Sequence, residues 1–435
     1  MSSEKVFVFG AGVDKKLGLP LANQIIPELS HFANNEGTNI SKLLRSKDKL
    51  KTNFSFKTFI KSTVRKFINN NQFQNQGFIN EIKKLKDKDG QYTPRISFFI
   101  MLDEQLSKIH QGNKIHEDFV KILKKLFGNK IDDLNDDDNG ILSTIHFDFS
   151  DLIKLTLKQL LNEAINGDDI FLDEQDKKLY DVIVKQLFNF EKLLSESFIG
   201  FYTGKESDIK RYMYVAWLLW SYMLYKEISV KDLSDSVYER LDKDSKLITF
   251  NYTDFISNHI QKENRIHFHG YNRSYIRLKN REFITPEDNN ALKNIRLLRD
   301  VYNLIKSLPI CLNQDKFIPG IIPPVEIKPL ISISFLKLWY KAMDWIEAAE
   351  KIIIVGYSFA FADEHFNDML RQSARNKKII IVNPAFKTII PQLTPIFNCY
   401  DHNFHETEIQ EKAALKYENL MIINACAEEI DLNRI

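Results

Sequence analysis

The hydrophobic pattern divides the chain into regions with different periods. Residues 6–9 form a continuous run of β-branched and aromatic side chains that ends at a glycine. Runs of the same kind return only after residue 246. Continuous apolar runs of this length are typical of strands that are buried on both faces of a parallel sheet. The pattern therefore predicts one strand at the start of the chain and further strands within 247–251, 265–270, 352–356 and 379–384.

The region between these runs has a helical period. From about residue 23 to residue 245, apolar residues recur every three or four positions, and glycine and proline are scarce. The most apolar stretch, residues 212–225, is shorter than the ~20 residues that cross a bilayer, so we expect a buried helix there. The acidic run at 132–140 predicts a solvated loop. The clearest helical patterns lie at 78–86, 119–127, 147–164 and 179–198.

The order of these elements predicts the fold class. Strands that alternate with helices, such as the one expected at 335–350, indicate an α/β protein with a Rossmann-like, doubly wound parallel sheet. Because one strand cannot form a sheet, the strand at 6–9 must pair with strands that follow residue 246. We therefore expect a discontinuous α/β domain of residues 1–22 and 246–435. A large helical insertion, residues 23–245, interrupts it and is a candidate for oligomer contacts or regulation.

Each predicted strand ends in a small or polar cluster, and ligands of open α/β sheets bind beyond the carboxyl ends of the strands. After the first strand, glycine allows the backbone to approach a phosphate, and a following helix start favours negative charge. The next glycine, Gly18, lies six residues after Gly12, whereas the usual dinucleotide fingerprint has three. The clusters are Gly10-Ala11-Gly12, Asn251-Tyr252-Thr253-Asp254, His269-Gly270, Gly356-Tyr357-Ser358 and Asn383.

An asparagine and a histidine at adjacent strand ends suit water-dependent chemistry at a sugar carbon. The Asn251 amide can hold a water molecule, and the His269 imidazole can take a proton near neutral pH. Beside a phosphate turn, this pair points to cleavage of a nucleotide's glycosidic bond. Other roles stay open: Asn251 or Ser358 can serve as a helix cap, His269 can be structural, and His267 with His269 can form a metal pair.

Composition narrows the class of protein. The 435 residues include 60 basic and 58 acidic side chains, so no global charge favours nucleic acid. The three cysteines, Cys311, Cys399 and Cys426, are far apart, which predicts a reducing compartment and excludes a four-cysteine zinc module. The first apolar run is too short for a secretory signal. We therefore expect a cytoplasmic protein without a bound metal.

Several of these segments together resemble a known family. In order and position they are similar to SIR2-like (sirtuin-fold) proteins, and more narrowly to bacterial antiphage SIR2 NADases and AbiH-like abortive-infection proteins. The resemblance covers residues 5–22 and about 246–400. The matching motifs are Gly10-Ala11-Gly12-Val13-Asp14 with Gly18-Leu19-Pro20, Thr249 to Asp254, His267 to Gly270, Ile322-Pro323-Pro324, and Val355 to Phe359 with Asp363-Glu364-His365.

The resemblance implies an NAD⁺ hydrolase that cleaves the nicotinamide–ribose bond and depletes cellular NAD⁺ in abortive infection. NAD⁺ would then be the substrate, with Asn251 holding the water or the nicotinamide ribose and His269 acting as general base. Gly10, Ala11 and Gly12 would approach the pyrophosphate. The remaining implied contacts are Gly356 and Ser358 to ribose and phosphate, Asn383 to the adenosine ribose, and further NAD⁺ contacts from Asp14, Pro20, Thr253 and Asp254.

Two departures from the family bear on this expectation. The absent four-cysteine module disfavours protein deacylation, although that activity and a non-catalytic NAD⁺ or ADP-ribose sensor remain alternatives. Asp14 stands where such motifs usually have serine, and a carboxylate beside a pyrophosphate is repelled unless it turns away or binds ribose hydroxyls. The resemblance also implies a homo-oligomer and a partner such as a HerA-like helicase or ATPase.

Overall fold

The chain forms two compact units in the computed structural model. The sheet unit contains residues 1–22, 36–53 and 190–435, and the helical unit contains 23–35 and 54–189. Residues 36–53 and 190–245, which the hydrophobic pattern assigned to the helical insertion, therefore group with the sheet. The loop expected at 132–140, Cys311 and Pro324 lie outside the described residues. These are 5–21, 24–87, 89–110, 116–128, 149–162, 173–234, 236–310, 316–323, 328, 332–373 and 376–435.

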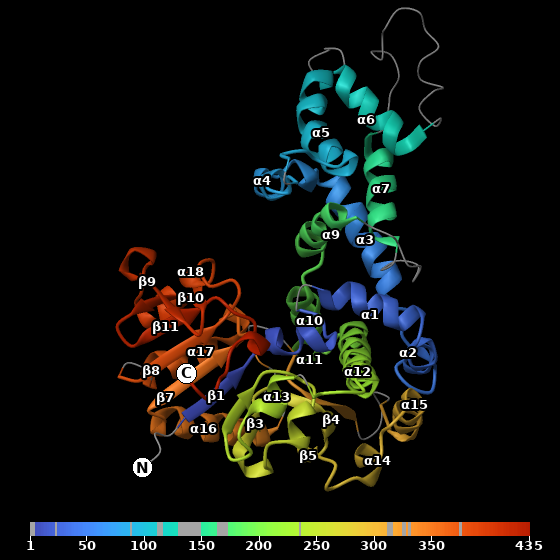
Figure 1. The fold of residues 1–435 in the computed structure, drawn as a ribbon. Helices are drawn as coiled ribbons and strands as arrows, with labels where there is room; N and C mark the ends of the chain where they lie inside the picture. The colour runs from blue at the N-terminus through green and yellow to red at the C-terminus, as the bar shows by residue number, and fades with distance from the viewer. Residues whose placement is uncertain are drawn as a thin grey trace, which may run out of the picture. The chain divides into compact units, whose positions relative to one another are not determined.

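A large, mostly parallel β-sheet forms the core of the sheet unit (Figure 1). Among the described residues its strand order is β3-β2-β1-β7-β8-β11-β10-β9. The first six of these strands are parallel, and β10 and β9 continue the sheet antiparallel. The expected α/β fold with a doubly wound sheet is thus confirmed. The strands are β1 Lys5–Phe9, β2 Lys246–Thr249, β3 Arg265–His267, β7 Lys351–Val355, β8 Lys378–Val382, β9 His405–Ile409, β10 Lys412–Tyr417 and β11 Leu420–Ile423.

The register of the central strands places their carboxyl ends side by side. Phe9 at the end of β1 pairs with Thr249 of β2 and with Val355 of β7. From β1 the chain adds β2 and β3 on one side, whereas β7, β8 and β11 follow on the other side. The order therefore reverses between β1 and β7, which is where open α/β sheets form a ligand crevice. The burial of the last four residues of β1, β7 and β8 explains their continuous apolar sequence.

A small antiparallel sheet of order β5-β4-β6 accompanies the large one and packs on helix α12. Trp217 and Trp220 of α12 donate their indole N–H groups to the carbonyl oxygens of Phe317 and Ser274, at 3.2 and 3.0 Å. The expected buried helix is confirmed, since residues 212–224 are all buried. No helix in the described ranges is long and apolar enough to span a membrane. The elements are α12 Glu206–Ser229, β4 Gly270–Arg277, β5 Glu282–Ile284 and β6 Phe317–Ile321.

The sheet unit contains further helices, and residues 433 and 435 are hydrogen-bonded to the large sheet. Lys5 and Lys351, at the starts of β1 and β7, donate to the carbonyl oxygens of Asn433 and Ile435 at 2.8 and 2.9 Å. The other helices of the sheet unit are α2 Thr38–Arg45, α10 Phe190–Phe198, α11 Gly200–Thr203, α13 Val237–Arg240, α14 Asn290–Lys293, α15 Leu298–Ser307, α16 Ile333–Ala348, α17 Glu364–Ser373 and α18 Ile390–Phe397.

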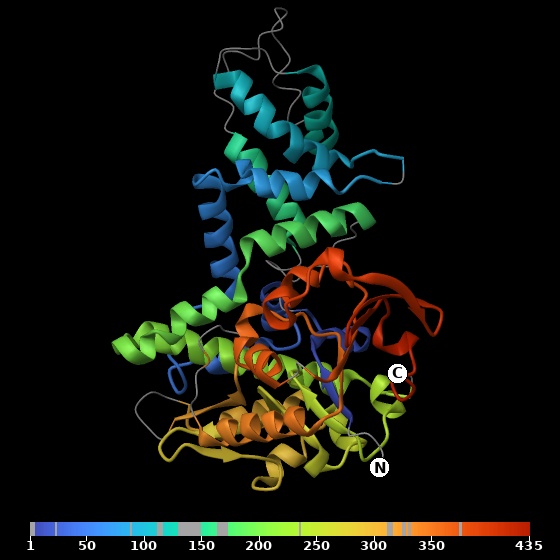
Figure 2. The ribbon, with the colours of Figure 1, turned by 90° about the vertical axis from the view of Figure 1, so that its left-hand side faces the viewer.

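Helices and short turns make up the described part of the helical unit (Figure 2). Its core is aromatic, with the Phe98 ring stacked on Phe119 and in edge contact with Phe99. The helical pattern at 179–198 belongs to two helices, because the chain becomes extended at Phe188. The helices are α1 Ile25–Asn34, α3 Phe56–Asn69, α4 Gln76–Lys83, α5 Pro94–His110, α6 Glu117–Phe127, α7 Phe149–Leu160 and α9 Glu174–Leu187.

Candidate functional site

The glycine turn after β1 packs directly against the end of β7. The Gly10 and Gly12 amides donate to the carbonyl oxygens of Val355 and Gly356, both at 2.9 Å. A β-carbon at Gly10 would lie 2.5 Å from the Tyr357 Cα, so a larger residue does not fit. These glycines therefore allow two strand ends to meet, and their two amides are already used within the protein. Ala11 and Gly12 remain exposed on the turn.

Asp14, the next polar residue, turns inward. Its side chain is only 1% exposed. One carboxylate oxygen accepts from the Tyr238 hydroxyl at 2.5 Å and the other from the Thr253 hydroxyl at 2.6 Å. Both oxygens of Asp14 are thus engaged within the protein, whereas the sequence left open either an inward turn or contact with ribose hydroxyls. Thr253 is likewise buried and engaged with Asp14.

Burial raises the pKa of the Asp14 carboxyl from 3.8 to about 6, against the hydrogen bonds from Thr253 and Tyr238, which lower it. The folded state thus holds a proton that the unfolded state releases between these two pH values. The free energy of unfolding should therefore fall as the pH rises from about 4 to 6, by about 3 kcal/mol for this group.

The variant Asp14→Asn should lack this contribution. Urea unfolding followed by tryptophan fluorescence measures it, because all four tryptophans lie in the sheet unit. The difference in stability between wild type and variant should change between pH 4 and pH 7. A constant difference would mean that Asp14 does not titrate in this range.

Asn251 lies two residues after the end of β2 and is 6% exposed. Its backbone amide donates to the Thr249 hydroxyl at 3.1 Å, and its side-chain Nδ2 donates to the Tyr238 hydroxyl at 3.4 Å. Tyr238, on α13, therefore contacts both Asn251 and Asp14. Sequence reasoning missed Tyr238, because it lies in the helical region and belongs to none of the strand-end motifs.

His269 lies between β3 and β4, with its buried Nε2 3.2 Å from an Asp363 carboxylate oxygen but outside hydrogen-bond geometry. Lys328 donates to the same oxygen at 3.1 Å. Burial lowers the pKa of His269, Lys328 lowers it further, and Asp363 opposes both effects. Burial disfavours ionisation of Asp363, but the attraction of His269 and Lys328 lowers its pKa to about 2. His269 is therefore neutral near pH 7 and faces an ionised carboxylate.

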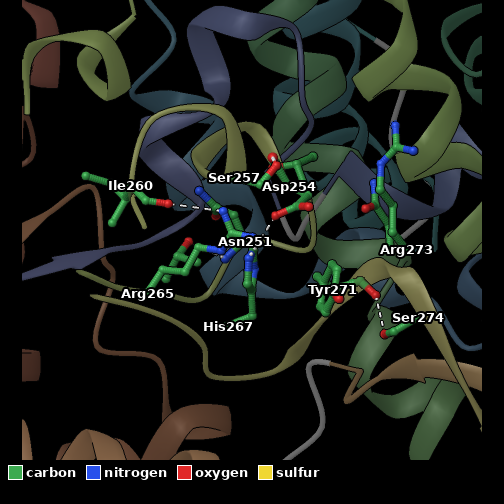
Figure 3. A network of polar contacts seen from close by, with 12 residues as sticks. Asn251, Asp254, Ser257, Ile260, Arg265, His267, Tyr271, Arg273 and Ser274 are labelled. Carbon is green, nitrogen blue, oxygen red and sulfur yellow. Dashed lines mark hydrogen bonds and ion pairs between the residues drawn. The ribbon is translucent and has the colours of Figure 1, made fainter. Parts of the chain in front are cut away.

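His267 faces a different carboxylate. Figure 3 shows the Asp254 carboxylate and the His267 ring pointing toward each other, 3.2 Å apart at Nε2. The ring stacks on Tyr271, and its buried Nδ1 has no hydrogen-bond partner among the described residues. His267 and His269 face separate carboxylates. They therefore do not form the metal-binding pair that the sequence left open. The described residues contain no group of three or more histidine, cysteine, aspartate or glutamate side chains arranged for a metal ion.

Glu227, at the end of α12, connects this helix to the strand ends. Its carboxylate accepts from the Asp254 amide at 2.7 Å, from Asn272 Nδ2 at 2.8 Å and from Arg273 Nε at 2.8 Å. This carboxylate, whose side chain is 9% exposed, holds the loop after β2 against β4. The sequence gives little indication of this role, because Glu227 is a single acidic residue that follows a long apolar stretch.

The residues after β7 and β8 lie on the other side of the glycine turn. Asn383 Nδ2 donates to the Tyr357 carbonyl oxygen at 3.2 Å, which joins the ends of these two strands. Ser358 is exposed, and the buried Phe359 beside it has a left-handed backbone with φ +52°. Such a conformation in a bulky residue is costly and is typical of ligand-binding loops. Pro20 is half-buried after the turn, and no contact places it with Asn251 or His269.

A surface hollow on the sheet unit is separate from these groups. It is lined by Ala349, Glu350 and Lys377, which precede β7 and β8. It therefore lies at the amino-terminal edge of the sheet, opposite the strand ends that carry Asn251 and His269.

Comparison with known proteins adds little to this geometry. No protein-family model and no curated protein matches the chain. A Sir2 homologue in complex with NAD is similar over 56% of this chain and 74% of its own, with 18% identity and a TM-score of 0.33. A mutant Sir2 homologue in complex with ADP-ribose has 21% identity and a TM-score of 0.29, over 45% of this chain and 70% of its own. A structure titled for the mechanism and regulation of Sir2 enzymes has 16% identity and a TM-score of 0.28, over 48% of this chain and 70% of its own. At these values the similarity alone assigns neither family nor activity.

Proposed function

We propose that this protein hydrolyses NAD⁺ at the nicotinamide–ribose bond and releases nicotinamide and ADP-ribose. The observation that carries the proposal is the grouping of chemistry at one edge of the sheet. The strand order reverses beside the Gly10 turn, and Asn251 follows the neighbouring strand β2. His269, held against Asp363, follows β3. These are the positions at which the sequence motifs resemble SIR2-like NADases.

The chemistry requires an oriented water and a group that takes its proton. The negative charge of Asp363, 3.2 Å from Nε2, favours electrostatically the His269 tautomer that carries its proton on Nε2, and in this proposal Nδ1 is the acceptor. In the proposed reaction a water oxygen bonds to the ribose C1′ as the C1′–N bond breaks, and that electron pair leaves with nicotinamide. His269 takes the proton that the water loses. Positive charge develops on the sugar in the transition state, so the oriented dipole of Asn251 contributes to the rate.

We further propose that the reaction depletes NAD⁺ during abortive infection by a phage. The support is the resemblance of the motifs to antiphage NADases and AbiH-like proteins. In this proposal the protein acts in the cytoplasm, and the helical unit carries oligomer contacts or binds a partner such as a HerA-like ATPase. An enzyme that consumes NAD⁺ without control would be toxic, so an inactive state is expected before infection.

Nicotinamide and ADP-ribose release from NAD⁺ by the purified full-length chain tests the proposed reaction. Chromatography should detect the two products in equal amounts, with no requirement for a second substrate. Release only in the presence of an acyl-lysine peptide would indicate a deacylase. ADP-ribose binding without turnover, in every assembly state and in extracts of infected cells, would indicate a sensor.

A further inference from the structure

Tyr238 connects two buried polar residues that lie far apart in the sequence. Its hydroxyl is 2.5 Å from Asp14 Oδ1 and 3.4 Å from Asn251 Nδ2. The second Asp14 oxygen accepts from Thr253 at 2.6 Å. All four residues are less than a tenth exposed. At such depth each donor needs an acceptor within the protein, so the directions of these hydrogen bonds depend on one another.

The chemistry of the three side chains fixes these directions. An ionised carboxylate only accepts, so Tyr238 gives its single proton to Asp14. The Tyr238 oxygen then offers only lone pairs, and Asn251 must turn its NH₂ group toward it. Burial, together with the charge of Asp14, raises the pKa of Tyr238 well above its usual value, so the phenol keeps this proton. Asn251 Oδ1 is consequently directed away from Tyr238 and remains an acceptor.

We propose that Asp14 and Tyr238 are positioning residues that hold the Asn251 amide with its Oδ1 toward the reacting water. This inference rests on the proposed function. A water that donates to Oδ1 keeps a lone pair for the ribose C1′. If the amide were reversed, its NH₂ group would donate to the water, engage one of its two lone pairs and draw electron density from its oxygen, which makes the water a weaker nucleophile. The carboxylate that replaces the usual serine therefore orients the catalytic amide and does not contact the pyrophosphate.

Protonation of Asp14 should reverse this chain of hydrogen bonds. The protonated carboxyl can donate to the Tyr238 oxygen, and Tyr238 then donates to Asn251, whose amide turns. The charged groups around Asp14 are Glu227 on α12, which raises its pKa, and His267 on β3, which lowers it; burial is the larger effect, and the pKa is about 6. The rate of NAD⁺ hydrolysis should therefore fall as the pH decreases below about 6.

The kcat and KM for NAD⁺ between pH 5 and pH 8 test the proposal. Tyr238→Phe should lower kcat ~10–10²-fold through loss of orientation and change KM by less than about threefold. It should also remove the part of the acid limb that Asp14 imposes and leave the part that protonation of the base His269 imposes. Asp14→Asn should remove the same part of the acid limb. The matched control is Tyr214→Phe, which removes a buried hydroxyl that contacts Ser41 of α2; its kcat and pH profile should match those of wild type. A Tyr238→Phe variant with wild-type kcat and an unchanged acid limb would overturn the proposal.

A second measurement separates this inference from the proposed function. In protein labelled with ¹⁵N-asparagine, the Asn251 NH₂ signal is assigned by its absence in Asn251→Ala. It should shift with a midpoint near pH 6 in wild type and stay constant in Asp14→Asn. If the chain never hydrolyses NAD⁺ but shows this titration, the proposed hydrolase activity is refuted, whereas the orientation of Asn251 by Asp14 and Tyr238 is supported. A signal independent of pH would refute the positioning even in an active enzyme. If Tyr238→Phe does not fold, the comparison of the Asn251 signal between wild type and Asp14→Asn tests the proposal.

Discussion

Replacing Asn251 with alanine is expected to reduce NAD⁺ hydrolysis by ~10²–10⁴-fold, the usual cost of losing an oriented catalytic group. Within the part of the chain that the structure describes, the side chain makes one weak hydrogen bond, from Nδ2 to the Tyr238 hydroxyl at 3.4 Å. Its loss should therefore cost only about 1 kcal/mol of stability. Steady-state nicotinamide release gives the rate, and tryptophan fluorescence shows that the sheet unit remains folded. The loss should appear in kcat more than in KM, because the amide acts on the water.

The matched control for this variant is Asn75→Ala in the helical unit. Asn75 caps α4 by accepting from the Gly77 and Phe78 amides at 2.8 and 3.4 Å. Its removal should cost about 1 kcal/mol in that unit and leave NAD⁺ hydrolysis unchanged. Turnover at the wild-type rate in Asn251→Ala would remove Asn251 from the site. It would also leave His269 as the sole candidate from the strand ends.

Replacing Gly356 with alanine is expected to destabilise the sheet unit by about 2–5 kcal/mol. Gly356 has φ +60°, a left-handed conformation that costs other residues about 1–2 kcal/mol. A β-carbon there would lie 2.7 Å from the Val13 nitrogen and 2.9 Å from the Gly12 carbonyl carbon. Both contacts are to backbone, which cannot move aside without separating β1 from β7. Crowding of this kind adds about 1–3 kcal/mol. Urea unfolding followed by tryptophan fluorescence measures the sum.

Gly18→Ala separates the two contributions. Gly18 also has a left-handed backbone, with φ +83°, but no atom lies within 4 Å of a β-carbon built there. It should lose only the conformational part, about 1–2 kcal/mol. Equal losses in the two variants would show that close packing of the strand ends does not require glycine.

The central strands could be predicted from sequence because both of their faces are buried. β1, β7 and β8 have no solvent-facing side, so their apolar runs are continuous and easily distinguished from helices. The run at 265–270 was harder to interpret, since β3 ends at His267 and the chain enters the small sheet at Gly270, where φ is +73°. β9 carries exposed polar residues over most of its length, so it has no comparable pattern.

The strand-end residues of the candidate site could be located for the same reason, whereas their partners could not. Asn251 and His269 follow apolar runs whose carboxyl ends share one edge of the sheet. Tyr238 lies on a single helical turn, and its bond to Asp14 spans 224 residues of sequence. Glu227 and Lys328 also come from segments without a strand. A side-chain contact between distant segments leaves no periodic trace, so only the folded chain reveals it.

The place of β1 in the middle of the sheet has a consequence during synthesis. β1 ends at Phe9, but its neighbours β2 and β7 begin only at Lys246 and Lys351. At a translation rate of about 5–20 residues per second, β1 waits roughly 12–50 s for its first neighbour. The edge that carries Asn251, His269 and Asp363 is complete only later still. A nascent chain that ends before Asp363 therefore has no assembled site, and under the proposed function it could not hydrolyse NAD⁺ until this residue has been made.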